Sequence, residues 1–188
     1  AGHAAYLLLE VDGSHEETVE AEAVAAGEAC LELGAADVLF ADTPAKMKEV
    51  WSVRRAIGAA VKKIAPYKEE DTVVPRRQMP DLIRGVRAII DRHGLRAICY
   101  GHAGDGNIHV NVMVDTSDPE AVKRQDEVLD ELFQRVLDMG GAITGEHGIG
   151  LAKKPWWPLA ASPEVRRLHA TIKRALDPEG ILNPGKFV

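Results

Sequence analysis

The stretch Gly101-His102-Ala103-Gly104-Asp105-Gly106-Asn107-Ile108-His109-Val110-Asn111 decides the fold, because it sets a glycine-rich turn between two runs of strand-forming residues. Only antiparallel neighbours can share so short a connection. We therefore expect strands over 97–102 and 108–114, paired as a hairpin. An antiparallel hairpin favours an α+β fold over a doubly wound parallel sheet.

Two histidines lie on either side of this turn. If the turn centres on its Asp-Gly pair, His102 faces His109, and Tyr100 faces Asn111 one pair further along. Residues opposite each other on neighbouring strands share a face, with Cβ atoms about 5 Å apart. Two imidazoles so placed could hold one metal ion.

A second motif, Gly145-Glu146-His147-Gly148-Ile149-Gly150, adds a carboxylate and a third imidazole. Adjacent residues do not easily point at one ion, so we expect one of Glu146 and His147 to be a ligand and the other to be a base. Three protein ligands would leave positions open for substrate. Nitrogen and oxygen donors without thiolate suit zinc, manganese, iron or cobalt.

The flanking sequence alternates between helical and extended patterns. Helices are expected over 14–33, from 44 to at least 61, and over 80–93, 118–139 and 163–176. Further strands are expected over 6–13 and 36–41, a loop over 65–71, a brief extended piece over 72–75, and a short strand or loop over 143–150. This order predicts an α+β fold with an antiparallel sheet and helices on one face. It resembles the split βαβ unit of ferredoxin-like folds, present once or duplicated.

The composition excludes several classes of protein. The 188 residues carry a net charge of -6, and 46% are hydrophobic. No basic patch suggests nucleic-acid binding. Two cysteines do not make a disulfide scaffold and favour a reducing compartment, so we expect a cytoplasmic protein. No apolar run reaches the roughly 18 residues of a membrane span. Membrane contact, at the inner membrane, is expected only through a partner subunit.

Three motifs together resemble the C-terminal substrate domain of the FAD-linked oxidases of the vanillyl-alcohol-oxidase superfamily. They are GHAGDGNIHVNV at 101–112, GEHGIG at 145–150 and DPEGILNPGK at 177–186. The nearest branch is the group of the glycolate oxidase large subunit, D-lactate dehydrogenase and D-2-hydroxyglutarate dehydrogenase. The resemblance covers essentially all of residues 1–188, which we expect to be one substrate- and metal-binding domain.

The resemblance implies a role for particular residues. It assigns His102, His109 and Glu146 as ligands of a divalent metal, zinc first and manganese or iron as alternatives, and His147 as the base. It assigns Arg54, Lys68 and Asn111 to substrate binding, and Asn183 to contact with the flavin domain. Gly58 stands where some relatives carry a hydroxyl residue, which argues against a glutarate-like substrate.

The resemblance also implies the chemistry. A 2-hydroxy acid would be oxidised to a 2-oxo acid, with hydride passing to FAD held mainly by a separate N-terminal domain expected to lie outside this chain. Alone, the chain is expected to be inactive. A homodimer is compatible with this picture. Two alternatives stay open: a flavin-independent metal-dependent hydrolase, and a non-catalytic domain with a structural metal.

Overall fold

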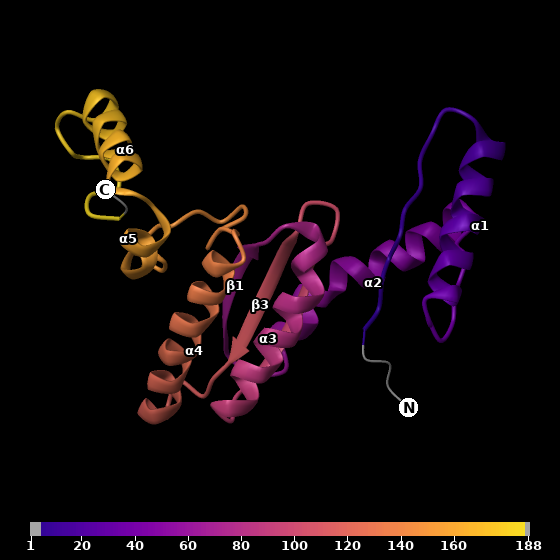
Figure 1. Cartoon of the computed structure of the whole chain (residues 1–188), viewed down its shortest axis with the longest axis horizontal. Helices are drawn as coiled ribbons and strands as arrows, with labels where there is room; N and C mark the ends of the chain where they lie inside the picture. The colour runs from indigo at the N-terminus through magenta and orange to yellow at the C-terminus, as the bar shows by residue number, and fades with distance from the viewer. Residues whose placement is uncertain (1–4, 187–188) are drawn as a thin grey trace. The chain divides into compact units, whose positions relative to one another are not determined.

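The computed structural model describes residues 5–186, which divide into two compact units after Ala56 (Figure 1). The first unit contains α1 (Glu16–Glu32) and the beginning of α2 (Pro44–Lys62). The strands expected over 6–13 and 36–41 are not found, because residues 5–56 form no β-ladder. A strand needs a hydrogen-bonded partner, and here Phe40 instead packs its ring against Gly27 of α1.

The second unit, from Ile57 onward, is built on a three-stranded antiparallel sheet. Its strands are β1 (Tyr67–Val73), β2 (Arg96–His102) and β3 (Asn107–Met113), in the spatial order β1-β3-β2. The central strand β3 is therefore hydrogen-bonded on both sides.

Two helices complete a β-α-β-β-α order. After the short 3-10 helix η1 (Arg76–Gln78), α3 (Met79–Arg92) connects β1 to β2, and α4 (Pro119–Asp138) follows β3. The predicted α+β class and split βαβ arrangement are confirmed. The fourth strand of a ferredoxin-like sheet is reduced to one bridge between Val73 and Ala142. No second copy of the unit occurs within residues 5–186.

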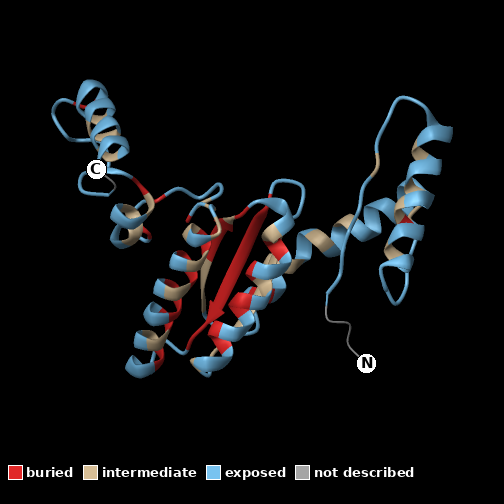
Figure 2. Ribbon diagram, viewed as in Figure 1, coloured by how far each residue is buried: buried red, intermediate tan, exposed pale blue. Residues whose placement is uncertain are grey.

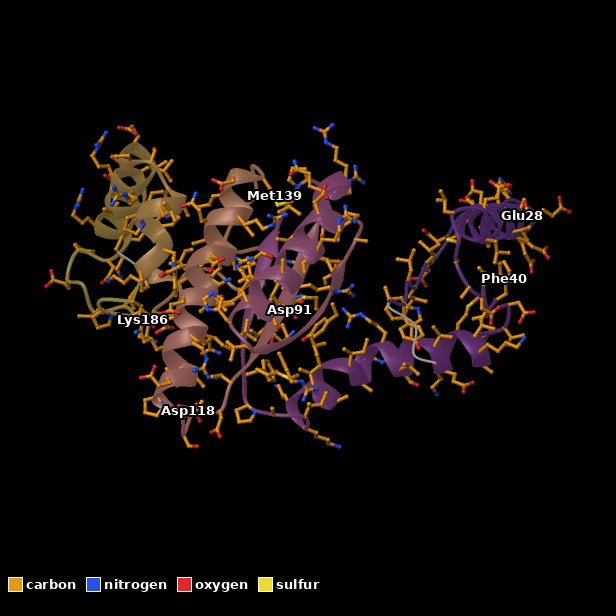
Figure 3. All side chains as sticks on the ribbon, turned by 60° about the horizontal axis from the view of Figure 1, so that its bottom comes forward. Glu28, Phe40, Asp91, Asp118, Met139 and Lys186 are labelled. Carbon is orange, nitrogen blue, oxygen red and sulfur yellow. The ribbon has the colours of Figure 1, made fainter. Side chains whose placement is uncertain are left out.

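Two helices, α4 and α6, begin at a residue whose side chain caps the first turn. Asp118, labelled in Figure 3, accepts a hydrogen bond from the backbone N–H of Glu120 at 3.0 Å and starts α4. Ser162 does the same for α6 (Pro163–Leu176), bonding the N–H of Val165. Between them lie the 3-10 helix η2 (Lys154–Trp156) and the single turn α5 (Trp157–Ala160).

The hydrophobic core lies between the sheet and the pair α3 and α4 (Figure 2). From β3, Ile108, Val110 and Val112 point towards these helices and are buried. The helices contribute Leu82, Val86, Ile89, Val128, Leu129, Leu132 and Phe133. The helices pack on one face of the sheet, as predicted. The other face of β3 is not covered by α3 and α4.

The loop predicted over 65–71 is wrong, because most of that segment forms β1. Its polar residues predict a loop, yet Glu70 and Asp71 are buried. The cause is Lys153, which reaches both carboxylates from far along the chain. A buried charged residue is tolerated when it is paired, and the partner is not visible from local sequence.

The hairpin register also differs from the prediction. Tyr100 lies opposite His109, and His102 lies opposite Asn107. The turn is thus centred one residue earlier than its Asp-Gly pair, so each pairing shifts by two residues. Because side chains alternate with a period of two, a shift of two keeps every residue on its predicted face.

Across residues 5–186, no helix combines the length and apolar character needed to cross a bilayer.

Candidate metal and substrate site

The face of the sheet opposite the helices carries polar side chains that are nevertheless buried. Asn107, His109 and Asn111 of β3 alternate with the core valines and are almost fully shielded from solvent. The register places His109 on one rung with Asp71 of β1 and Tyr100 of β2. His109 is therefore the centre of this face.

His109 has a polar group at each ring nitrogen. Its Nδ1 lies 3.1 Å from Oε1 of Glu69, and its Nε2 lies 3.3 Å from Oε1 of Glu146. The Tyr100 ring stacks on the imidazole with centroids 5.3 Å apart and planes 27° apart. With only 4% of its surface exposed, His109 is held in one orientation by these neighbours.

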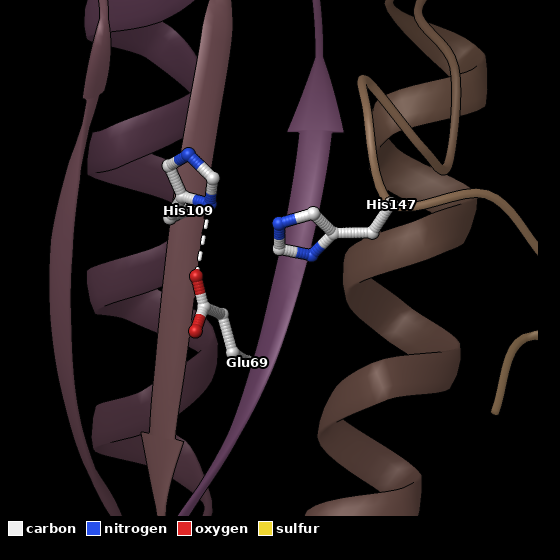
Figure 4. A group of neighbouring side chains, drawn as sticks. All are labelled: Glu69, His109 and His147. Atoms are coloured by element: carbon white, nitrogen blue, oxygen red, sulfur yellow. Dashed lines mark ion pairs between the residues drawn. The ribbon is translucent and has the colours of Figure 1, made fainter. Parts of the chain in front are cut away.

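Three predicted ligands converge at this point. One ligand atom from each of His102, His109 and Glu146 lies within 4.8 Å of the other two. A second trio of donors meets the same criterion and shares the same histidine: Glu69, His109 and His147 (Figure 4). Glu69 was not predicted as a donor, because it belongs to the segment wrongly predicted as a loop.

These donors fit a divalent cation. Two ligands bound at about 2.0–2.1 Å in a tetrahedral site lie roughly 3.4 Å apart, and His109 Nε2 lies 3.3 Å from Glu146 Oε1. The buried Oδ1 of Asn111 makes no hydrogen bond. The carboxylates of Glu69 and Glu146, beside the two ring nitrogens of His109, also give this face negative charge. The donor set is the nitrogen and oxygen mixture that zinc, manganese and iron share.

His147 borders this group and also reaches solvent. Its Nε2 lies 3.9 Å from Oε1 of Glu146, and its ring centroid lies 5.5 Å from that of His109. Nearly half of the side chain, 47%, is exposed. A histidine next to the ligands and open to solvent is placed to exchange protons.

Asp71 fixes the loop that carries Glu146 and His147. Its Oδ2 accepts hydrogen bonds from the backbone N–H groups of Gly145, Glu146 and His147 at 2.9, 2.6 and 2.9 Å. Lys153 is paired with the other carboxylate oxygen. Burial alone would raise the pKa of Asp71, but the Lys153 ammonium and these N–H groups hold that pKa well below its ordinary value.

The predicted substrate-binding residues are placed differently. Asn111 is fully buried on the polar face, where its Nδ2 donates to the Ile98 carbonyl at 3.1 Å. Lys68 pairs with Val112, so it points to the helix face, where Nζ lies 5.2 Å from the Trp156 ring. The structure does not place Lys68 among the metal donors, and its role in substrate binding stays a prediction.

Two further predicted residues lie elsewhere in the chain. Arg54 is on α2 within the first unit, and its role towards a substrate carboxylate stays a prediction. Asn183 lies in the tail after α6 and adopts a left-handed backbone conformation, with φ of 46°. Its contact with a flavin domain also stays a prediction.

Comparison with known proteins gives the class. The family model of the FAD linked oxidases, C-terminal domain, matches residues 1–187, so the chain belongs to this family. Its relatives include D-lactate dehydrogenase of Anaerostipes hadrus, 37% identical over 97% of this chain and 39% of that protein. Glycolate oxidase subunit GlcD of Escherichia coli K12 is 35% identical over 98% of this chain and 37% of its own.

A D-2-hydroxyglutarate dehydrogenase of Xanthomonas citri pv. viticola is also 35% identical, over 98% of this chain and 40% of that protein. The chain thus spans about two fifths of the length of these relatives. A solved structure, 4-ethylphenol oxidase from Gulosibacter chungangensis in its isoeugenol complex, matches with a TM-score of 0.52. The match covers 79% of this chain and 31% of the oxidase chain, with 22% sequence identity. A likeness at this identity shows the fold alone.

Proposed function

We propose that this chain is the substrate- and metal-binding part of an FAD-dependent dehydrogenase or oxidase of 2-hydroxy acids. The observation that carries the proposal is the convergence of His102, His109 and Glu146 beside His147. Membership of the FAD-linked oxidase family supports it, as do relatives named for D-lactate, glycolate and D-2-hydroxyglutarate. These relatives are oxidoreductases by name, which leaves the hydrolase alternative without support.

His102, His109 and Glu146 would hold a divalent cation, zinc being our first choice. When bound, the cation supplies positive charge that stabilises the hydroxyl oxygen as it loses its proton, and FAD supplies the acceptor for the hydride. Glu69, 3.1 Å from Nδ1 of His109, would keep a proton on that nitrogen and leave Nε2 free as the ligand. The flavin would be held by another domain, with Asn183 in contact with it.

His147 would take the proton from the substrate hydroxyl. It is the imidazole next to the ligands that retains access to solvent, so it can pass the proton on. Oδ1 of Asn111, which makes no hydrogen bond in the structure, would orient the substrate from the polar face of β3. Arg54 would bind the substrate carboxylate through two parallel hydrogen bonds.

Two features of the site favour a short substrate with one carboxylate. Glu69 adds a negative charge beside His109, which would repel a second carboxylate. A Cβ built on Gly58 would lie 3.9 Å from the Tyr100 hydroxyl, so this position offers no side chain to bind a distal group. We therefore favour glycolate or D-lactate over 2-hydroxyglutarate.

The test is reduction of the flavin in the complete enzyme that contains this chain. The His147→Ala variant should bleach its flavin about 10²–10⁴-fold more slowly with a 2-hydroxy acid, the usual worth of a general base. The matched control is His169→Phe, which keeps a ring against Trp157 and lies on α6, and it should bleach at the wild-type rate. Bleaching at the wild-type rate in His147→Ala would refute the assignment of the base.

A further inference from the structure

The loop from Ile143 to Gly148 is held by one carboxylate from a distant strand. Asp71 has no exposed surface, and its Oδ2 accepts three consecutive backbone N–H groups, those of residues 145–147. Its backbone carbonyl accepts a fourth hydrogen bond, from Gly145 at 3.1 Å. Thr144 adds its hydroxyl, 3.3 Å from Oδ1, and receives the N–H of Gly148 at 2.8 Å.

Lys153 closes the arrangement from the other end of the segment. Its buried Nζ is paired with Oδ1 of Asp71 and donates to the Ile143 carbonyl at 2.8 Å. Oε2 of Glu70 lies 3.5 Å away. One ammonium therefore joins β1 to the start of the loop while it neutralises the carboxylate that binds the middle of the loop.

The anchored residues are the functional ones. Glu146 and His147 supply two of the three N–H groups that Asp71 binds, so the direction of both side chains depends on it. Asp71 also shares a rung of the sheet with His109, which sets the spacing between the loop and the central histidine. Gly148, at the end of the loop, adopts a φ of 76°, a conformation that glycine enters without strain.

A contribution to stability alone is a weak explanation for this pair. Replacing a buried ion pair with apolar residues of similar size is often neutral or stabilising. Three N–H groups aimed at one oxygen are instead what fixes a backbone in a single conformation.

We propose that Asp71 and Lys153 are positioning residues, which hold Glu146 and His147 where the metal and the substrate are bound. The proposal rests on the proposed function for its chemistry. Its geometric part, that Asp71 fixes the loop, can be measured without metal or flavin.

The test compares two aspartates of similar chemistry in the full chain. Asp71→Asn removes the charge but keeps the shape, and Glu70 remains to balance Lys153. Asp177→Asn is the control. Asp177 is buried, is paired with Lys173 and accepts the N–H groups of Ile181 and Leu182, each at 3.0 Å, in the tail.

Two quantities are measured for each variant: affinity for zinc by calorimetric titration, and hydrogen exchange of the N–H groups at 145–147. Asp71→Asn should bind zinc about 10–100-fold more weakly and lose exchange protection in the loop, whereas Asp177→Asn should change neither. Wild-type zinc affinity with wild-type loop protection in Asp71→Asn would overturn the proposal.

The outcomes separate the two hypotheses. If the wild-type chain binds no zinc, the metal part of the proposed function fails, and loop protection alone decides the role of Asp71. If Asp71→Asn does not fold, Thr144→Val removes a contact to the same carboxylate at lower cost. That variant should weaken zinc binding severalfold, and unchanged affinity and unchanged loop protection would count against the proposal.

Discussion

The two faces of β3 are buried to a similar degree but by different means. Ile108, Val110 and Val112 are covered by α3 and α4, and their burial requires no partner atoms. On the other face, Asn107, His109 and Asn111 are as well shielded, although each carries polar atoms. Atoms on this side, the side-chain amide of Asn107 and Oδ1 of Asn111 among them, lack hydrogen bonds.

This difference separates stability from function along a single strand. Apolar burial contributes roughly 1.5–3 kcal/mol for each large side chain. An unsatisfied buried polar atom costs about 1–3 kcal/mol instead. The unsatisfied polar atoms on one face of β3 therefore indicate a functional role. A bound cation or substrate would satisfy them.

The sharpest test of the comparison changes adjacent residues of β3. His109→Ala should lower zinc affinity by more than about a hundredfold, since even outer-shell changes cost 10–100-fold. Val110→Ala should leave the affinity within about threefold and lower the stability by roughly 2 kcal/mol. Calorimetric titration and urea unfolding of both variants measure the two effects. Equal losses of affinity would mean that the faces are not independent.

A second variant tests the helix-covered face from the other side. Leu129 of α4 is completely buried in the core. Leu129→Ala should reduce the free energy of unfolding by about 3 kcal/mol, within the 2–5 kcal/mol range for such truncations. Urea unfolding in the presence of EDTA measures this without a contribution from metal. A loss below 1 kcal/mol would show that the core is looser than its burial indicates.

The thiol of Cys99 reports on the helix-covered face of β2. Burial raises the pKa of this thiol to about 11, although the Arg87 charge partly opposes the shift. Only the thiolate reacts, so at pH 8 alkylation of Cys99 should be about a hundredfold slower than that of a free cysteine with a pKa near 8.5. Peptide mass spectrometry separates Cys99 from Cys30, and Cys99→Ser is the control. Rapid labelling at pH 8 would contradict the predicted burial.

The smallest effect is expected where α3 meets α4 at the surface. Glu131 lies 2.7 Å from His93 and is paired with Arg92, and Glu127 lies 3.6 Å from the same histidine. The hydrogen bond with His93 is the largest cause that lowers the pKa of Glu131; burial opposes it, and Arg92 lowers the pKa further. A lowered pKa stabilises the fold above the unfolded value of about 4.3, and this is lost as pH falls through the lowered pKa.

The Glu131→Gln variant should therefore be less stable than wild type by about 0.5 kcal/mol at pH 7, because solvent screens this exposed pair. The difference should shrink towards pH 3. Urea unfolding at both pH values measures it, and a difference that grows on acidification would reverse the assigned sign.

Much of the second unit could be predicted because its signals are local. The hairpin follows from a glycine-rich turn, and the starts of α4 and α6 follow from Asp118 and Ser162 with proline next in sequence. The convergence of His102 and His109 was predicted even though the register was wrong. An error of two residues moves each pairing but leaves each side chain on its face.

The parts that failed depend on distant partners. β1 could not be recognised from Lys68-Glu69-Glu70-Asp71, because its charges are buried only through Lys153 and through pairing with β3. The same error hid Glu69 as a donor. For 6–13 and 36–41, apolar composition indicated strands that find no ladder partner within residues 5–56.

The edge position of β1 has a consequence for self-association. Within the described residues, no strand pairs with the outer edge of β1 apart from the bridge at Val73. An unpaired strand edge is a template for adding strands from other molecules. A second copy docking there would bring its own Glu69 and Glu70 towards this row of acids, and the Asp71 carbonyl is already occupied by Gly145. The charge of Glu69 and the occupied carbonyl of Asp71 thus disfavour the addition of a strand from another molecule at this edge.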